Sequence, residues 1–222
     1  MRRTLHAGVL LLLALAFVSC AAPSKKGAAA APQPLPSVEV RSYEGKDFSS
    51  VKDFRENSIK GTQDVDTASY RLDVSGLVKK PLTLTYDQVI DRKTYSKVVT
   101  LHCVEGWDAT ILWEGVRVKD LLEQAGYDPK AALVIFTAYD GYTSSLPLPY
   151  LVDGDILLAY KMNDARMIPE RGFPFALVAE DKWGYKWIKW VTGMEVSNDA
   201  SFRGYWEQRG YNQNGDLSGP MF

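Results

Sequence analysis

The cysteine at position 103 carries the most distinctive chemistry in this sequence. The chain contains two cysteines and two histidines. Cys20 ends an apolar leader and His6 lies within it, so the mature protein is expected to keep only Cys103 and His102. A lone thiol cannot form an internal disulfide. Cys103 is therefore an inert core residue, a reactive nucleophile or a soft ligand for a metal.

The scarcity of cysteine and histidine excludes several kinds of site. One mature histidine excludes a zinc site built from several histidines. One mature cysteine excludes a self-contained iron–sulfur cluster and a Cys-x-x-Cys-His haem attachment. The 26 basic and 27 acidic residues nearly balance, which gives no electrostatic case for binding nucleic acid. Any electron transfer therefore needs another cofactor and an external partner.

The residues before Cys103 predict the element that positions it. Residues 97–103 are rich in β-branched side chains and predict a buried strand, which Gly106 ends. Consecutive side chains of a strand point to opposite faces, so His102 and Cys103 should not converge on one site. This argues against a Cys–His nucleophile pair. It favours Cys103 at a strand end, in a loop where Gly106 lets a backbone or ligand come close.

The rest of the domain predicts short strands, turns and few helices. Apolar alternation predicts strands at 70–75, 132–138, 155–160, 173–179 and 187–196. Helices are predicted at 86–90, capped by Thr85, and at 118–124, ended by Gly126. Turns are predicted at 113–115, 140–142 and 183–185. Together they predict a mixed, β-dominated α+β fold without regular βαβ alternation.

The amino-terminal residues predict export and a lipid anchor. Residues 1–19 combine a positive start with an apolar run too short for a permanent membrane helix, as in a signal peptide. Phe17-Val-Ser-Cys20 resembles a bacterial lipobox, so we expect diacylation of Cys20 and a lipoprotein on the periplasmic side or cell surface. An incidental cysteine after an ordinary signal peptide is the alternative. Residues 20–36 predict a flexible tether, and residues 37–222 predict one folded domain.

Several ordered motifs resemble the molybdopterin-binding domain of the sulfite oxidase family. They are Leu101-His-Cys-Val-Glu-Gly-Trp107, Trp113-Glu-Gly115, Asp140-Gly-Tyr-Thr-Ser-Ser-Leu-Pro-Leu148, Lys182-Trp-Gly-Tyr-Lys-Trp-Ile-Lys189, Gly204-Tyr-Trp-Glu207 and Gly210-Tyr211. The resemblance covers about residues 54–211. It implies an α+β fold holding one molybdenum atom through a pterin dithiolene, the molybdenum–molybdopterin cofactor. It also implies that a protein cysteine completes the sulfur ligands.

By position, the resemblance assigns that catalytic, metal-binding role to Cys103. A soft thiolate suits a sulfur-rich metal centre, and coordination would keep it deprotonated. The resemblance also places Lys186 and Lys189 at the pterin phosphate region, where cations suit an anionic cofactor. A solvated strand face is the alternative for both lysines.

The resemblance implies further contacts in two loops. Asn57 and Ser58 lie where an upstream loop touches the pterin, although a polar surface loop is the alternative. Asp140 and Tyr142 are expected at the mouth of a substrate pocket, although Asp-Gly is also an ordinary turn.

Two alanines depart from the pattern of related sulfoxide-reducing enzymes. Those enzymes carry an arginine at the position of Ala176 and a threonine near that of Ala138, and both contact the cofactor. Losing the arginine would remove a charge-assisted bond to phosphate. Arg171 or Lys182 is expected to replace it, or else cofactor binding is weaker or lost.

The leading hypothesis is a lipid-anchored, exported molybdenum oxidoreductase. It would transfer an oxygen atom to or from a small sulfite-like or sulfoxide-like substrate and exchange electrons with an external cytochrome or membrane quinone protein. A second hypothesis is a non-catalytic binding lipoprotein that keeps the fold without the cofactor, motivated by Ala138 and Ala176. A third is a thiol enzyme that uses Cys103 directly. The absence of a resolving cysteine and of a convergent histidine argues against it.

Overall fold

The structure is a computed structural model, and it describes residues 38–222. The expected signal peptide, the Cys20 lipidation site and the tether at residues 20–36 lie outside the described residues.

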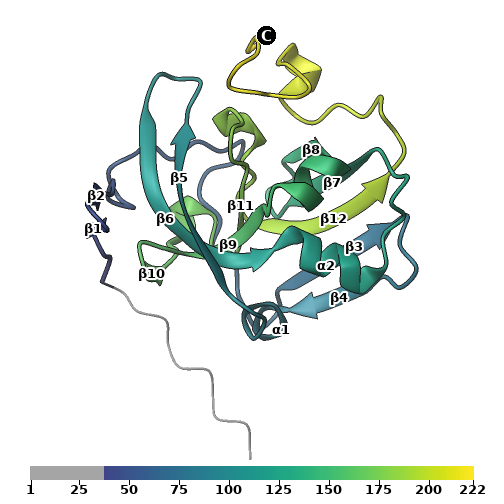
Figure 1. Ribbon diagram of the computed structural model, residues 1–222, viewed down its shortest axis with the longest axis horizontal. Coiled ribbons are helices and arrows are strands. Elements are labelled where there is room, and N and C mark those ends of the chain that lie inside the picture. Colours follow the sequence, from purple (N-terminus) through teal and green to yellow (C-terminus); the bar gives the residue numbers. More distant parts are fainter. Residues whose placement is uncertain (1–37) are drawn as a thin grey trace, which may run out of the picture. The chain divides into compact units, whose positions relative to one another are not determined.

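The first of two five-stranded sheets contains the strand that ends immediately before Cys103 (Figure 1). Its strand order is β10–β9–β6–β5, and β11 also pairs with β9. All its pairings are antiparallel. The strands are β5 (Tyr95–His102), β6 (Asp108–Arg117), β9 (Leu157–Met162), β10 (Ala165–Arg166) and β11 (Ala176–Val178).

The second sheet has the order β4–β3–β12–β7–β8. Its central pair, β12 and β3, is parallel, and the other pairs are antiparallel. The strands are β3 (Arg71–Gly76), β4 (Leu82–Thr85), β7 (Leu133–Ala138), β8 (Thr143–Pro147) and β12 (Val191–Ser197). A small hairpin joins β1 (Ser42–Tyr43) to β2 (Lys46–Asp47).

The helices are short: α1 has its predicted bounds, α2 runs one residue further than predicted, and α3 was not predicted. In α1 (Tyr86–Ile90) the Thr85 hydroxyl accepts from the Gln88 amide and completes a capping box. In α2 (Val118–Ala125) the apolar face is buried, and Gly126 ends the helix in the left-handed conformation at φ 68°. The remaining helical segments are α3 (Leu148–Asp153) and the 3-10 turns η1 (Pro169–Arg171), η2 (Gly184–Lys186) and η3 (Glu207–Arg209).

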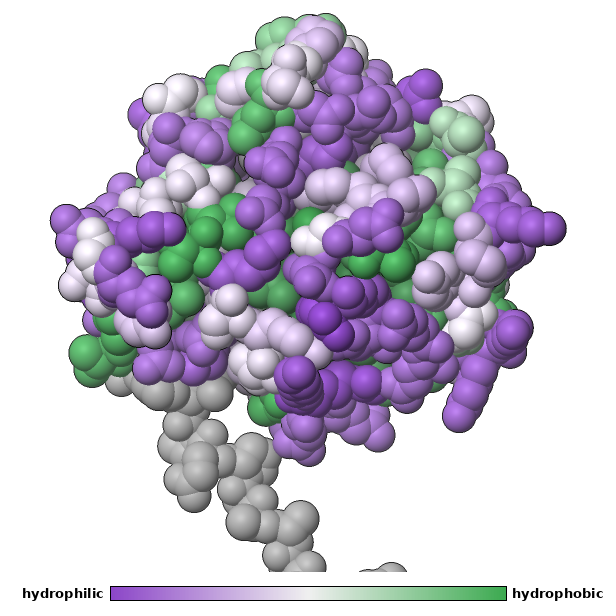
Figure 2. Space-filling view, viewed as in Figure 1, coloured by the Kyte–Doolittle hydropathy of each residue, from purple (hydrophilic) through white to green (hydrophobic). Residues whose placement is uncertain are grey.

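The hydrophobic core draws on both sheets. Strand β3 alternates buried and exposed residues, and Leu72 and Val74 are fully buried. Burying a side chain of this size contributes about 1.5–3 kcal/mol. On the face shown in Figure 2, the hydrophobic side chains form patches separated by hydrophilic residues. This arrangement is the mixed, β-dominated α+β class predicted from the sequence.

Several predicted elements were wrong in type or extent. Residues 113–115 do not form a turn: they lie within β6, at a register shift between Glu114 and Gly115. A Cβ at Gly115 would lie 2.1 Å from the Leu158 carbonyl oxygen. The absence of a side chain at Gly115 therefore allows β6 and β9 to pack closely. The predicted buried strand before Cys103 is mostly half-buried, because β5 is an edge strand.

The two late strands are shorter than predicted. β11 covers only Ala176–Val178, and β12 begins at Val191 because Trp190 adopts φ 52°, which interrupts the extended chain. Within residues 38–222, no helix has the length and apolar character needed to cross a membrane.

Candidate functional site

Cys103 is the first residue after β5, at the start of the turn into β6. The turn is closed by hydrogen bonds from the Cys103 amide to the Trp107 carbonyl (3.0 Å) and from the Gly106 amide to the Cys103 carbonyl (3.0 Å). Gly106 has φ 83°, a conformation that glycine adopts without strain. The thiol is 7% exposed and lines a cavity of about 450 Å³. The predicted strand-end position of Cys103 is therefore confirmed.

His102 is directed away from this site, as strand alternation predicted. Its Nδ1 lies 2.7 Å from the Asp108 carboxylate, and the residue does not line the cavity. This geometry gives no Cys–His nucleophile pair and argues against the thiol-enzyme hypothesis.

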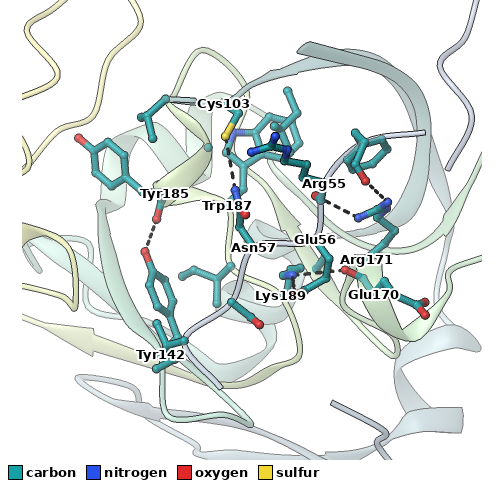
Figure 3. A pocket seen from close by; sticks show the side chains of 18 of the residues that line it. Arg55, Glu56, Asn57, Cys103, Tyr142, Glu170, Arg171, Tyr185, Trp187 and Lys189 are labelled. Carbon is teal, nitrogen blue, oxygen red and sulfur yellow. Dashed lines mark hydrogen bonds and ion pairs between the residues drawn. The ribbon is translucent and has the colours of Figure 1, made fainter. Parts of the chain in front are cut away.

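A loop covering residues 54–61 lies across the cavity and faces the thiol. The Asn57 side-chain amide donates to the Cys103 sulfur at 3.8 Å, and the two groups point toward each other in Figure 3. Ser58 also lines the cavity, and within residues 38–222 its buried hydroxyl has no hydrogen-bond partner. A buried hydroxyl without a partner is costly, so Ser58 is suited to a ligand atom.

Arg171 anchors this loop through hydrogen bonds to backbone carbonyls. Its guanidinium donates to the backbone carbonyls of Val51 (2.7 Å), Arg55 (3.2 Å) and Phe54, and stacks over the Phe54 ring at 3.9 Å. Burial lowers the pKa of Arg171. Arg171 lines the cavity as predicted, but its guanidinium donates its hydrogen bonds to the protein backbone. It does not replace the arginine missing at Ala176.

Lys189 lines the cavity and is anchored to the same loop. Its Nζ lies 2.5 Å from the Glu56 carboxylate and 3.3 Å from the Glu170 carbonyl. Burial lowers its pKa, and the Glu56 carboxylate acts in the opposite direction. The next residue, Trp190, is a bulky side chain at φ 52°, a strained conformation of the kind that clusters at functional sites.

The structure corrects the expectation for Lys186 and Lys182, because neither lines the cavity. The Lys186 ammonium is fully buried and bonds Glu207 (2.5 Å) and the Gln213 carbonyl (2.9 Å). Lys182 pairs with Asp216. Lys186 lies in the 3-10 turn η2, and Lys182 lies two residues before this turn. Both lysines form ion pairs with carboxylates of the carboxyl-terminal segment and so hold that segment in place.

Asp140 and Tyr142 form a turn and also line the cavity. The Tyr142 amide donates to the Asp140 carboxylate at 2.9 Å, and the Tyr142 hydroxyl donates to the Tyr185 carbonyl at 2.5 Å (Figure 3). Burial raises the pKa of Tyr142 well above its ordinary value, so this hydroxyl stays protonated. The turn is therefore present and both residues line the cavity, whereas their place at the mouth of a substrate pocket stays a prediction.

The free thiol is held largely protonated by its surroundings. Burial raises the pKa of Cys103, and the Glu105 carboxylate adds to this effect. Hydrogen bonds from the Glu105 backbone and Asn57, together with the charge of Arg55, act in the opposite direction. Such a thiol is a weak nucleophile by itself, whereas a bound metal would hold it as a thiolate.

The sequence analysis assigned no site role to several lining residues, among them Arg55, Glu56, Trp206 and Tyr211. Arg55 and Glu56 lie in the loop beside Asn57, and no sequence motif indicated a role for them. Trp206 and Tyr211 come from the carboxyl-terminal segment, and the Gly204-Tyr-Trp-Glu207 and Gly210-Tyr211 motifs were the signal for them. Of the two departing alanines, Ala176 lines the cavity and Ala138 does not.

The residues around Cys103 fit a pterin cofactor that carries a metal. The aromatic rings can stack on a planar heterocycle, and the unpartnered Ser58 hydroxyl can form a hydrogen bond with a ligand atom. The positive charges of Arg55 and Lys189 can attract a phosphate. Within residues 38–222, no group of three or more His, Cys, Asp or Glu side chains could hold a metal ion. A metal at Cys103 therefore needs most of its ligands from a cofactor.

Comparisons with known proteins agree with this geometry. Residues 59–206 match the family model described as the oxidoreductase molybdopterin binding domain. The uncharacterized oxidoreductase YuiH of Bacillus subtilis is 36% identical over 152 residues, which cover 68% of this chain and 76% of that protein. The protein-methionine-sulfoxide reductase catalytic subunit MsrP of Campylobacter jejuni is 27% identical over 170 residues, which cover 69% of this chain and 57% of that protein.

One solved structure supports the expected fold. The sulfane dehydrogenase SoxCD from Paracoccus pantotrophus superposes with a TM-score of 0.62 at 21% identity, covering 75% of this chain and 51% of that one.

Proposed function

Because the chain belongs to the oxidoreductase molybdopterin-binding domain family, we propose that it transfers an oxygen atom to or from a small sulfite-like or sulfoxide-like substrate at a molybdenum centre bound by Cys103. The chain is a molybdopterin-dependent oxidoreductase, and molybdenum–molybdopterin is the cofactor. The predicted family, enzyme class and cofactor are confirmed. The metal ligand, the substrate and the site residues are our proposals.

One observation supports the site most strongly: the free cysteine of the described region is buried in a cavity that is also lined by the unpartnered Ser58 hydroxyl and by the cations Arg55, Arg171 and Lys189. Cys103 would complete the sulfur ligands of the metal, and Ser58 and Asn57 would bond the pterin. Arg55 and Lys189 would face its phosphate. When bound, the cofactor supplies the two-electron chemistry, and the protein supplies orientation and electrostatics.

The protein side chains have separate tasks in this proposal. Arg171 fixes the loop that carries Asn57 and Ser58 by bonding its carbonyls. Tyr142 keeps its proton and holds the segment that begins at Tyr185. The aromatic walls limit water around the reacting atoms, which strengthens electrostatic interactions there.

Elemental analysis of the full-length, natively exported protein tests the proposal. We expect molybdenum in amounts comparable to the protein, and loss of oxygen-transfer activity in Cys103→Ser with the fold retained. Absence of molybdenum, under conditions that load a positive control, would contradict the proposal.

A second candidate is a binding lipoprotein that keeps the fold without a functional cofactor. It is favoured by one observation: Ala176 lines the cavity where related enzymes have an arginine, and Arg171 does not replace that charge. Replacing Arg2-Arg3 with Lys-Lys separates the candidates. Export should be blocked for a protein that folds around its cofactor before export, whereas a plain lipoprotein should pass.

We also propose that the protein is exported, is lipidated at Cys20, and exchanges electrons with an external cytochrome or membrane quinone protein. The names of two relatives, a catalytic subunit and the putative protein-methionine-sulfoxide reductase subunit YedZ1 of Azospira oryzae, support a separate electron partner. Labelled palmitate should be incorporated into the wild type and not into Cys20→Ala. Equal labelling of both would refute lipidation at this residue.

A further inference from the structure

Asn214 and Gly215 are the only asparagine–glycine pair in the sequence. The backbone nitrogen that follows an asparagine can attack the side-chain carbonyl of that asparagine, and a glycine hinders the attack least because it has no Cβ. Asparagine is for such reasons a thermolabile residue. The pair lies in the carboxyl-terminal segment, residues 204–222, which contributes Trp206 and Tyr211 to the lining of the cavity.

The fold requires the glycine at position 215. Gly215 is buried and adopts φ 64°, in the left-handed region that glycine enters without strain. A Cβ at this position would lie 2.5 Å from Lys186 Cγ and 3.0 Å from the Tyr185 hydroxyl oxygen. Because the Lys186 side chain is itself fully buried, it has no room to move aside. The packing around Lys186 therefore keeps a glycine directly after Asn214.

Asn214 is open to the reaction. It is exposed to solvent, and within residues 38–222 its side-chain amide has no hydrogen-bond partner. The Asn212 side-chain oxygen accepts from the Asn214 amide at 2.9 Å and from the Gly215 amide at 3.2 Å. The second distance is at the long limit for an N–H···O bond. The attacking nitrogen of Gly215 is therefore weakly held, and water reaches the side chain that it attacks.

The residues on both sides of Asn214 are bonded to the body of the domain. The Lys186 ammonium donates to the Gln213 carbonyl at 2.9 Å, and the Trp183 amide donates to the Gly215 carbonyl at 2.8 Å. One additional backbone carbon between these two carbonyls would lengthen the chain by about 1.5 Å. A hydrogen bond does not tolerate a displacement of that size, so the two bonds could not both be kept.

We propose that Asn214 deamidates spontaneously and that its isoaspartyl product releases the carboxyl-terminal segment from Lys186 and Trp183. The Gly215 nitrogen bonds to the side-chain carbonyl carbon of Asn214 and gives up its proton, and ammonia leaves, so that a cyclic imide forms. Water then opens the imide at either carbonyl. One opening gives aspartate, and the other gives isoaspartate, in which the chain runs through the side-chain carbon. The net change exchanges ammonia for water and needs no oxidant or reductant.

The release would reach the cavity through its aromatic wall. The Trp206 and Tyr211 rings line the cavity with their centroids 5.1 Å apart. In Figure 1 the segment that carries them lies at the same end of the molecule as the β5–β6 turn that begins with Cys103. When the Gln213 carbonyl is displaced, the buried Lys186 ammonium loses an acceptor, which is costly. The wall therefore loses part of its attachment.

Peptide mapping by mass spectrometry of the full-length protein, aged in mildly alkaline buffer, tests the modification. We expect conversion of Asn214 to aspartate and isoaspartate, and none at Asn198, which is also exposed but precedes Asp199. Asn214→Gln should show no conversion at this position, because the longer side chain closes the ring less readily. If Asn214 stays intact while a synthetic peptide of residues 211–217 converts, the proposal is overturned.

Hydrogen exchange tests the release. We expect the Trp183 amide to exchange about ten-fold faster in the isoaspartyl form than in the unaged protein. Asn214→Asp is the matched control, because it adds the same charge without the extra backbone carbon, and it should keep the protection. Unchanged protection of Trp183 in the isoaspartyl form would overturn the release. Equal loss of protection in Asn214→Asp would assign the effect to charge and overturn the role of the backbone carbon.

Discussion

The ammonium of Lys186 lies 2.5 Å from the Glu207 carboxylate, and both side chains are completely buried. The pair joins the 3-10 turn η2 to η3 across 21 positions of the chain. Removing one partner of a buried ion pair leaves an uncompensated charge, which is far more costly than removing both.

We therefore predict that Lys186→Met lowers the free energy of unfolding by about 3–5 kcal/mol. The double variant Lys186→Met/Glu207→Leu should recover a large part of this loss, because no charge remains buried. Urea unfolding followed by circular dichroism measures both. If the single variant is as stable as the wild type, the Lys186–Glu207 pair does not stabilise the attachment of the carboxyl-terminal segment.

The environment of Lys186 could not be predicted from the sequence. The motif that predicted a cofactor contact places Lys186 and Lys189 three positions apart, and only Lys189 reaches the cavity. The local signals were sufficient for Thr85, Gly126 and the strand end at Cys103, because neighbouring residues determine a cap or a strand end. The partners of Lys186 and Lys189 lie 21 and 133 positions away, so no local pattern identifies them.

The clamp formed by Arg171 predicts a local effect. Arg171→Ala should increase hydrogen exchange and proteolysis within residues 51–61, because three backbone carbonyls lose their donors. Arg171→Lys should not restore protection, since an ammonium cannot reproduce the planar fork.

Arg166→Ala is the control for this prediction. Arg166 is an exposed cation that also stacks on a ring, at 4.1 Å over Phe173, but it does not line the cavity. Equal protection of the loop in Arg171→Ala and Arg166→Ala would contradict the proposed clamp.

Glu39 predicts a pH dependence of stability. Burial alone would raise its pKa, but hydrogen bonds from the Ser50 hydroxyl, the Val51 amide and the Asn163 side chain lower it below the ordinary 4.5. Because the folded state holds the carboxylate, its contribution is present above pH 4.5 and is lost as the pH falls through the lowered value.

The wild type should therefore lose stability more steeply below about pH 4.5 than Glu39→Gln does. Thermal unfolding between pH 3 and 7 provides the comparison. Glu123→Gln is the control, because Glu123 is exposed and its carboxylate has no hydrogen-bond or ion-pair partner within residues 38–222. Parallel curves for wild type and Glu39→Gln would show that Glu39 contributes nothing.

The close contact of β6 with β9 predicts that Gly115 tolerates no side chain. Gly115→Ala would place a Cβ 2.1 Å from the Leu158 carbonyl oxygen, and overpacking of this kind costs about 1–3 kcal/mol or more. Gly193→Ala is the matched control in the other sheet, because its nearest neighbour would lie at 3.5 Å. Equal stability of the two variants in urea would refute the close contact.

X-ray absorption at the molybdenum edge tests most directly whether Cys103 binds the metal. Full-length wild-type protein and Cys103→Ser, each loaded with molybdenum, would be compared by their molybdenum–sulfur scattering. We predict that the variant keeps its fold and the two sulfurs of the pterin, and shows one sulfur ligand fewer than the wild type. Identical sulfur scattering in the two proteins would contradict the assignment of Cys103 as the protein ligand.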